Sequence, residues 1–281
     1  MIIWIASYPK SGNTYLRSFL ASYFYSKKGK FDFDLLLKIH QFPNIKFSKT
    51  KSSSELEASS KWILNQNNFF NKDKLHFVKT HNCLTPYQGR KFTTKDQTIG
   101  AIYIVRDPRN LITSLTHHYS LSYETALQYM LDEKSTLTQK SYDEDFSNFT
   151  YLGSWSKHYN SWKKTEDFKV LFIRYEDLEF KKEETFEKII SFINELNNNK
   201  QNIDEKKFYN AIKSTAFSNL QNKEKNEGFE ESVISKETGK KKIFFNLGFK
   251  NKWQKILPSD IRDQIEESLK KDLKNLGYRI D

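Results

Sequence analysis

The 281-residue sequence predicts an α/β fold of three layers, in which a central parallel sheet is flanked by helices. Four runs that are apolar or begin with apolar residues predict strands at residues 2–6, 75–81, 99–105 and 168–174. The first, from Ile2 to Ile5, shows no alternation, as expected of a strand buried on both faces of a parallel sheet. Segments with apolar residues at helical spacing separate these runs. The length is near the upper size for one domain, so we expect a single domain spanning residues 1–281.

The first run enters a loop at residues 7–14 and continues as an amphipathic helix. Gly12 permits a backbone turn that a side chain would block, and Ser11 and Thr14 offer hydroxyls at the helix start. The unpaired N–H groups of the first helical turn, the helix dipole and the ammonium of Lys10 together predict an anion site. Strand, phosphate loop and helix in this order predict a P-loop-like fold. A Walker loop places its lysine directly after the second glycine, whereas Lys10 precedes Gly12, which weakens the case for a nucleotide kinase.

The other helices follow from apolar periodicity and capping residues. We expect them near residues 34–40, 55–67, 123–131, 149–164, 183–196, 205–214 and 258–278. Trp155, Tyr159 and Trp162 form a stripe that indicates packing in the core. The polar loop within residues 121–148 is a candidate lid over an acceptor pocket, and residues 221–242 are expected to be mobile until a donor is bound.

The second apolar run ends in Lys79, Thr80 and His81, at the edge of the sheet where ligands bind in such folds. Imidazole has a pKa suited to removing a proton from a hydroxyl near neutrality, so His81 is a candidate general base. A hydrogen-bonded structural histidine is the alternative. His76 falls inside the strand and is assigned to packing.

The third run leads into Arg106, and Ser114 lies about two helical turns further on. Guanidinium pairs two phosphate oxygens at once, which makes Arg106 a candidate for binding a terminal phosphate. Arg109 is left out of the phosphate site, because it can instead be a surface ion-pair partner for Asp107, and Pro108 suits the first turn of the helix.

The loop at residues 8–15 resembles the 5′-phosphosulfate loop of the sulfotransferases that use 3′-phosphoadenosine 5′-phosphosulfate (PAPS). Within that family, the chain resembles a bacterial-like form of the cytosolic type. Asn13 and Tyr15 replace the usual Thr and Trp. Residues 79–81 resemble the family's Lys-Thr-His triplet, in which the histidine is the catalytic base. Residues 106–114 are similar to its 3′-phosphate motif.

The resemblance continues through the second half of the chain. It implies that Tyr175 contacts the adenosine, that Thr215 contacts the nucleotide and that Phe217 stacks on adenine. Residues 244–253 resemble the family's closing loop and keep Gly248 and Trp253, but Asn246 and Leu247 stand where Arg and Lys are usual. The missing charge is supplied by a neighbouring lysine, or the donor is bound more weakly. The candidate lysines are Lys240, Lys241, Lys242, Lys250 and Lys252.

The resemblance implies an enzyme that moves the sulfuryl group from PAPS to a hydroxyl or amine by in-line displacement. The implied catalytic residues are His81 as base, Lys10 at the leaving phosphate oxygen and Lys79 at the sulfuryl oxygens. The implied donor-binding residues are Lys10, Ser11, Gly12, Asn13, Thr14, Tyr15, Arg106, Ser114, Tyr175, Thr215, Phe217, Asn246, Leu247 and Gly248. The acceptor is a small molecule, a glycan or a lipid.

Composition narrows the remaining choices. The formal net charge is +11, but lysines are spread along the chain, and no nucleic-acid motif accompanies them, so no nucleic-acid partner is expected. The single cysteine, Cys83, excludes an internal disulfide and favours a reducing compartment; we expect a cytoplasmic protein without a membrane span. No cluster with metal-ligand spacing occurs, so no metal is expected. A small-molecule kinase using ATP and Mg²⁺, or a nucleotide-binding module without transfer, remain the alternatives.

Overall fold

A five-stranded parallel sheet forms the centre of the computed structural model, which describes residues 1–138, 144–235 and 238–280. The strand order is β2-β3-β1-β4-β7. The strands are β1 (Ile2–Ser7), β2 (His40–Gln41), β3 (His76–Thr80), β4 (Thr98–Val105) and β7 (Lys169–Arg174). The α/β prediction is confirmed, as are all four predicted strands. The two-residue edge strand β2 was not predicted, because two residues carry no periodicity.

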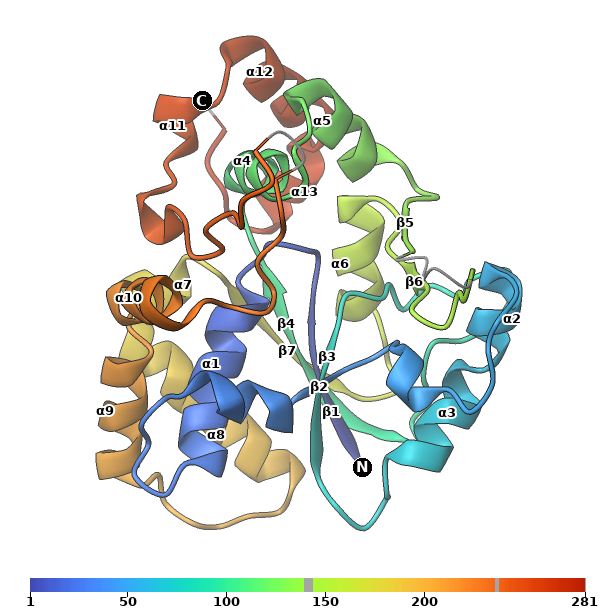
Figure 1. The fold of residues 1–281 in the computed structure, drawn as a ribbon, viewed down its shortest axis with the longest axis vertical. Coiled ribbons are helices and arrows are strands. Elements are labelled where there is room, and N and C mark those ends of the chain that lie inside the picture. The colour runs from blue at the N-terminus through green and yellow to red at the C-terminus, as the bar shows by residue number, and fades with distance from the viewer. Residues whose placement is uncertain (139–143, 236–237, 281) are drawn as a thin grey trace.

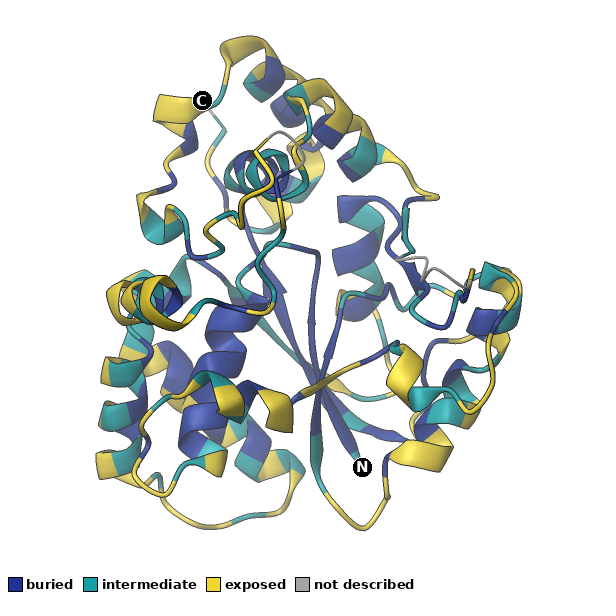
Figure 2. Cartoon of the chain, viewed as in Figure 1, coloured by how far each residue is buried: buried dark blue, intermediate teal, exposed yellow. Residues whose placement is uncertain are grey.

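The central strands β1, β3 and β4 are buried (dark blue in Figure 2), and two separate hydrophobic clusters cover the two faces of the sheet. Ile2, Trp4 and Ala6 of β1 point into one cluster, whereas Ile3 and Ile5 point into the other. This alternation between two cores explains why the strand is an uninterrupted apolar run in the sequence.

Helices cover the two faces as separate groups, and in Figure 1 α1, α8 and α9 lie on one side of the strands while α2, α3 and α6 lie on the other. The first cluster is packed by α2 (Glu55–Ser60), α3 (Trp62–Phe69), α4 (Pro108–Tyr119), α5 (Tyr123–Leu131), α6 (Trp155–Lys163), α12 (Ser259–Ser268) and α13 (Lys270–Asn275). The second is packed by α1 (Asn13–Tyr25), the 3₁₀ helix η1 (Phe33–Lys38), α7 (Asp177–Phe180), α8 (Lys182–Leu196), α9 (Glu205–Ser214) and α10 (Phe217–Glu227). The remaining elements are η2 (Ile45–Phe47), β5 (Thr136–Leu137), β6 (Thr150–Tyr151), η3 (Gly248–Lys250) and α11 (Trp253–Ile256).

Several helix bounds differ from the prediction for local reasons. The helix expected at 149–164 begins only at Trp155, because β6 precedes it and Ser154 Oγ accepts a hydrogen bond from Lys157 N at 3.2 Å. The helix expected at 55–67 is divided at Lys61, next to two serines whose hydroxyls bond to backbone carbonyls one turn back. The terminal helix is likewise divided. In place of the helix expected at 34–40, the chain forms the 3₁₀ helix η1 (Phe33–Lys38) and then enters β2 at His40.

The segment 217–227 is a helix, α10, although residues from 221 onward were expected to be mobile. Its stability comes from a contact distant in sequence, because Glu224 accepts hydrogen bonds from the backbone N–H groups of Phe244 and Phe245 at 2.7 and 2.9 Å. Two segments lie outside the described residues: residues 139–143, which are part of the predicted lid, and residues 236–237. Within the described ranges no helix is long and apolar enough to cross a membrane.

Candidate active site

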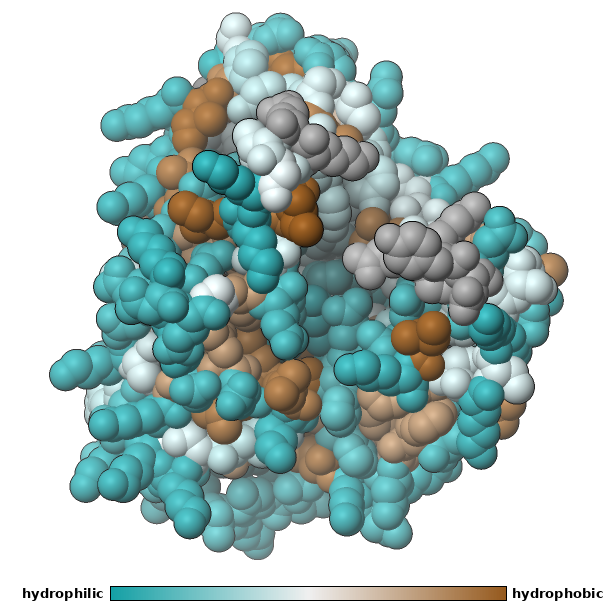
Figure 3. Space-filling view, in the orientation of Figure 1, coloured by the Kyte–Doolittle hydropathy of each residue, from teal (hydrophilic) through white to brown (hydrophobic). Residues whose placement is uncertain are grey.

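A cavity of about 750 Å³ lies along the carboxyl edge of the sheet. Its lining includes a residue from each strand end, in the order of the sheet: Gln41 of β2, His81 after β3, Lys10 after β1, Arg106 after β4 and Tyr175 after β7. Figure 3 shows the molecule hollowed near the centre of the face in view, with hydrophilic side chains inside the hollow. The structure therefore brings together residues that are up to 165 positions apart in numbering, from Lys10 to Tyr175.

The loop after β1 forms an anion cradle at the start of α1. Gly12 has φ +100°, and a Cβ there would lie 2.3 Å from the ring of Tyr175, so glycine is required both for the turn and for the close approach. Ser11 Oγ is buried and has no hydrogen-bond partner in the described part of the chain. The Asn13 amide donates to Ile5 O at 2.9 Å, which anchors the loop to β1 and leaves the backbone of Asn13 to face the cavity.

Lys10 lies in the cavity wall with its ammonium close to two groups from other elements. Its Nζ donates to Nδ1 of His118 at 3.3 Å and lies 3.8 Å from the centre of the Phe244 ring. Burial lowers the pKa of Lys10 to about 7. The positive charges of Arg106 and Lys79 lower this pKa further, whereas the negative charge of Glu231 raises it. Burial and the Lys10 charge also lower the pKa of His118 to about 3, so His118 is the neutral acceptor in this pair.

His81 follows β3 and is oriented by the end of β1. Its Nδ1 lies 2.7 Å from the carbonyl oxygen of Ser7, which accepts hydrogen bonds only, so Nδ1 carries the proton. Nε2 then holds the lone pair, and it has no hydrogen-bond partner in the described part of the chain. Burial and then the nearby Lys79 charge hold the pKa of His81 well below its ordinary value, so the ring is neutral at pH 7.

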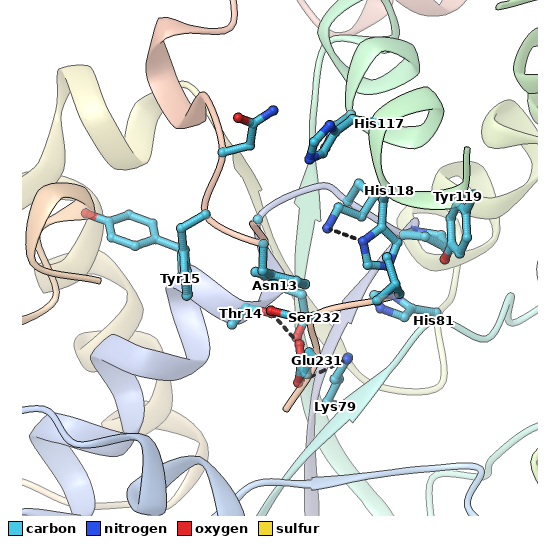
Figure 4. Close-up of a pocket in the computed structure, with 18 of the residues that line it drawn as sticks. Asn13, Thr14, Tyr15, Lys79, His81, His117, His118, Tyr119, Glu231 and Ser232 are labelled. Atoms are coloured by element: carbon cyan, nitrogen blue, oxygen red, sulfur yellow. Dashed lines mark hydrogen bonds and ion pairs between the residues drawn. The ribbon is translucent and has the colours of Figure 1, made fainter. Parts of the chain in front are cut away.

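Glu231 is a site residue that the sequence analysis did not identify. Its carboxylate accepts from the Thr14 hydroxyl at 2.9 Å and from Arg17, and it lies 3.6 Å from Lys79 Nζ. Figure 4 shows Glu231 between Thr14 and Lys79. Burial alone would raise the pKa of this carboxyl, but the charges of Arg17 and Lys79 outweigh it and hold the pKa well below the usual range. Burial, opposed by Glu231, lowers the pKa of Lys79 to about 8.

Arg106 and Ser114 both line the cavity, as expected from their spacing. The Arg106 guanidinium donates to Lys10 O at 2.8 Å and lies 4.4 Å from the centre of the Tyr175 ring, while its Nε is buried without a partner among the described residues. Arg109 is paired with Asp107 at 2.9 Å and with Glu266, which confirms that it lies outside the cavity wall.

The closing loop contributes six lining residues: Phe244, Phe245, Asn246, Leu247, Gly248 and Asn251. Gly248 has φ +54°, and a Cβ there would lie 2.4 Å from the ring of Phe217, which also lines the cavity. Thr215 does not line it: the residue is fully buried and its hydroxyl donates to Ala211 O at 2.7 Å.

The lysines considered as replacements for the missing Arg and Lys are not among the cavity's described lining residues. Lys242 donates instead to His117 O and to Ser120 Oγ, both at 2.7 Å, at the end of α4. Tyr15 does line the cavity, and its ring lies edge-on to that of Phe249, with centres 5.7 Å apart. In the described ranges, no group of three or more His, Cys, Asp or Glu side chains is placed to hold a metal ion.

The fold and this edge-spanning cavity define an α/β nucleotide-binding protein with a phosphate loop. Residues 2–277 match the family described as the sulfotransferase domain, and the chain belongs to that family. It is therefore an enzyme of the PAPS-dependent sulfotransferase class.

Curated relatives and solved structures agree with this assignment. The chain is 24% identical to mouse (Mus musculus) sulfotransferase 1E1 over 98% of this chain and 84% of the mouse protein. It is 20% identical to the amine sulfotransferase of Oryctolagus cuniculus, over 99% of this chain and 82% of that protein.

Among solved structures, retinol dehydratase in complex with androsterone and inactive cofactor PAP has a TM-score of 0.58 and 19% identity, covering 99% of this chain and 82% of that one. Mouse sulfotransferase SULT7A1 complexed with PAP has a TM-score of 0.55 and 20% identity, and the match covers 97% of this chain and 84% of that one. These likenesses show that the fold is shared.

The cavity suits a doubly phosphorylated adenosine. Ser11 Oγ and Arg106 Nε are buried polar atoms without partners in the described ranges, and they lie in the two segments expected to hold the two phosphates. The glycines at 12 and 248 let the aromatic rings of Tyr175 and Phe217 pack directly against the backbone at the cavity wall. The donor set consists of ammonium, guanidinium, hydroxyl and backbone N–H groups, which are the groups that bind phosphate oxygens.

Proposed function

We propose that this enzyme transfers the sulfuryl group of PAPS to an acceptor hydroxyl, with His81 as general base. The observation that carries the proposal is the hydrogen bond from His81 Nδ1 to Ser7 O, because it fixes the tautomer whose Nε2 lone pair is available in the cavity. The acceptor oxygen forms a bond to sulfur as its proton passes to Nε2, while the bond between sulfur and the phosphate oxygen breaks. Adenosine 3′,5′-bisphosphate leaves.

Lys10 neutralises the charge that grows on the leaving phosphate oxygen. Its position in the wall next to the phosphate loop supports this role, since electrostatic stabilisation is strongest in a site from which water is excluded. The 5′-phosphate is bound by Ser11, Gly12, Asn13 and Thr14. The 3′-phosphate is bound by Arg106 and Ser114. In this proposal Lys79, which lines the cavity and is ion-paired with Glu231, contacts the sulfuryl oxygens.

We also propose that residues 1–281 form one sulfotransferase domain that works in the cytoplasm without a metal. Tyr15, Tyr175, Phe217, Asn246, Leu247 and Gly248 surround the nucleotide in this proposal, and all six line the cavity. Thr215 acts indirectly in this proposal: its hydroxyl bonds to Ala211 O and stabilises the end of α9, which precedes Phe217.

Titration with adenosine 3′,5′-bisphosphate tests the donor site directly. Arg106→Ala is expected to weaken binding about tenfold to hundredfold, because a hydrogen-bonded charge pair is lost. Isothermal calorimetry gives the dissociation constants. Arg279→Ala, at an exposed position, is the matched control and should bind like the unchanged protein. Equal affinity in Arg106→Ala would contradict the 3′-phosphate contact, and absence of binding in the unchanged protein would contradict the donor site as a whole.

Glu231→Gln is expected to tighten bisphosphate binding about tenfold, because it removes a negative charge from the wall that receives the phosphates while keeping the side-chain shape. Glu205→Gln, at an exposed position outside the cavity, is the control and should bind the bisphosphate like the unchanged protein. Weaker binding in Glu231→Gln would instead mean that this carboxylate holds Arg17 and Lys79 in place for the donor.

A further inference from the structure

The cavity continues past His81 toward the β2 edge of the sheet, away from the phosphate loop and the nucleotide side. The lining residues on this side are Gln41, Asn44, Leu137, Thr138, Asn148 and Thr150. They come from the end of β2, the turn before η2, the end of β5 and the approach to β6. All six side chains are neutral, and five of them carry an amide or a hydroxyl.

Asn44 and Asn148 have side-chain amides whose orientation is fixed by the backbone. Asn44 Oδ1 accepts from Lys46 N at 3.0 Å, and Asn148 Oδ1 accepts from Ile45 N at 2.7 Å. Each oxygen is therefore occupied, whereas the NH₂ groups have no hydrogen-bond partner in the described part of the chain. The result is a pair of pre-oriented donors in the cavity wall.

The two threonines on this side supply acceptors. Thr138 Oγ1 donates its proton to Glu55 at 3.3 Å, and Thr150 Oγ1 donates to Asn148 O at 3.3 Å, so the lone pairs of both oxygens remain for a ligand. Tyr119, a half-buried ring that lines the same cavity, lies near His81 in Figure 4. Phe42, next to Gln41, also lines the cavity, so donors, acceptors and two aromatic rings together form a lining suited to hydroxyl groups on a carbon ring.

Resting on the proposed function, we infer that the acceptor is a neutral saccharide, bound by Asn44 and Asn148 with one of its hydroxyls at His81. Hydroxyls both donate and accept, and so match this lining. A sterol or a simple phenol would leave the two amides desolvated and unpaired, which disfavours it. An ammonium would face Lys10 and Lys79, and the carboxylate of Glu231 is already paired with Arg17 and Lys79.

The first test measures transfer from radiolabelled PAPS to two sets of acceptors at equal concentrations. One set contains neutral saccharides: lactose, maltotriose, cellobiose and chitobiose. The other contains 2-naphthol, androsterone and octylamine. Sulfation of at least one saccharide, in preference to the second set, is expected. Preference for the second set, or no transfer to any compound although the bisphosphate binds, would overturn this inference and leave the donor site standing. Failure of the bisphosphate to bind would overturn the proposed function itself.

The second test uses Asn44→Asp and Asn148→Asp, which keep the oxygen that accepts from the backbone but lose the NH₂ donor. The KM for the best saccharide is expected to rise about tenfold to hundredfold in each variant. Affinity for the bisphosphate should stay within about threefold, because both residues lie on the β2 side of His81. Asn68→Asp, at an exposed position on α3, is the charge control. An unchanged saccharide KM in both cavity variants would refute the role of the amides.

Discussion

His81→Ala is expected to lower turnover by about 10² to 10⁴, the usual contribution of a general base. Affinity for the bisphosphate should change little, because His81 lies between the donor side and the acceptor side, and its Nδ1 bonds to the protein backbone. Steady-state turnover with labelled PAPS and calorimetry with the bisphosphate measure the two quantities. Turnover within about threefold of the unchanged enzyme would remove His81 from the mechanism.

His76→Ala is the control for this experiment. His76 belongs to the same strand, but its Nε2 lies 3.1 Å from Asn71 O and its ring contacts that of Phe70, outside the cavity. Its replacement should leave turnover close to that of the unchanged enzyme.

The pH profile gives a second measurement of the same group. Because burial and the Lys79 charge hold the pKa of His81 well below its ordinary value, the ring is already in its basic form at pH 7. The rate of the unchanged enzyme should therefore fall only as pH drops well below the ordinary histidine pKa of about 6.5. His81→Ala should lose this acid limb.

The residues at the strand ends were predictable, because a parallel sheet brings the carboxyl ends of its strands to one edge regardless of their separation in sequence. Lys10, His81, Arg106 and Tyr175 all line the cavity for this reason. The ion pair between Arg109 and Asp107 is likewise local and does occur, but it is buried instead of lying at the surface, because Glu266 packs against Arg109 as a second partner.

Glu231 was missed because nothing local marks it. It lies in a charged segment without periodicity, and its bond to Thr14 joins residues 217 positions apart. The fixed amide of Asn148 was missed for the same reason, because its partner is a backbone group 103 positions earlier. Thr215 shows the opposite case, in which a motif matched but the folded chain turns the hydroxyl to a helix carbonyl.

Lys10→Ala is expected to lower turnover by about 10² to 10³ without a matching change in acceptor KM, because Lys10 acts on charge that develops mainly in the transition state. Turnover and acceptor KM are measured at saturating PAPS. An effect confined to acceptor KM would argue against this role. Lys28→Ala, at an exposed position outside the cavity, is the control.

Lys10→Arg tests whether the protonation of Lys10 controls the affinity for the bisphosphate, because the variant keeps a positive charge that does not titrate near neutrality. With a pKa of about 7 in the free protein, Lys10 must take up a proton when the phosphates bind above neutrality. The dissociation constant of the bisphosphate should therefore rise about tenfold per pH unit above pH 7 in the unchanged enzyme. In Lys10→Arg, whose guanidinium stays charged, the constant should remain level until Lys79, with a pKa of about 8, begins to lose its proton. The same rise from pH 7 in both proteins would show that the ammonium of Lys10 does not face the phosphates.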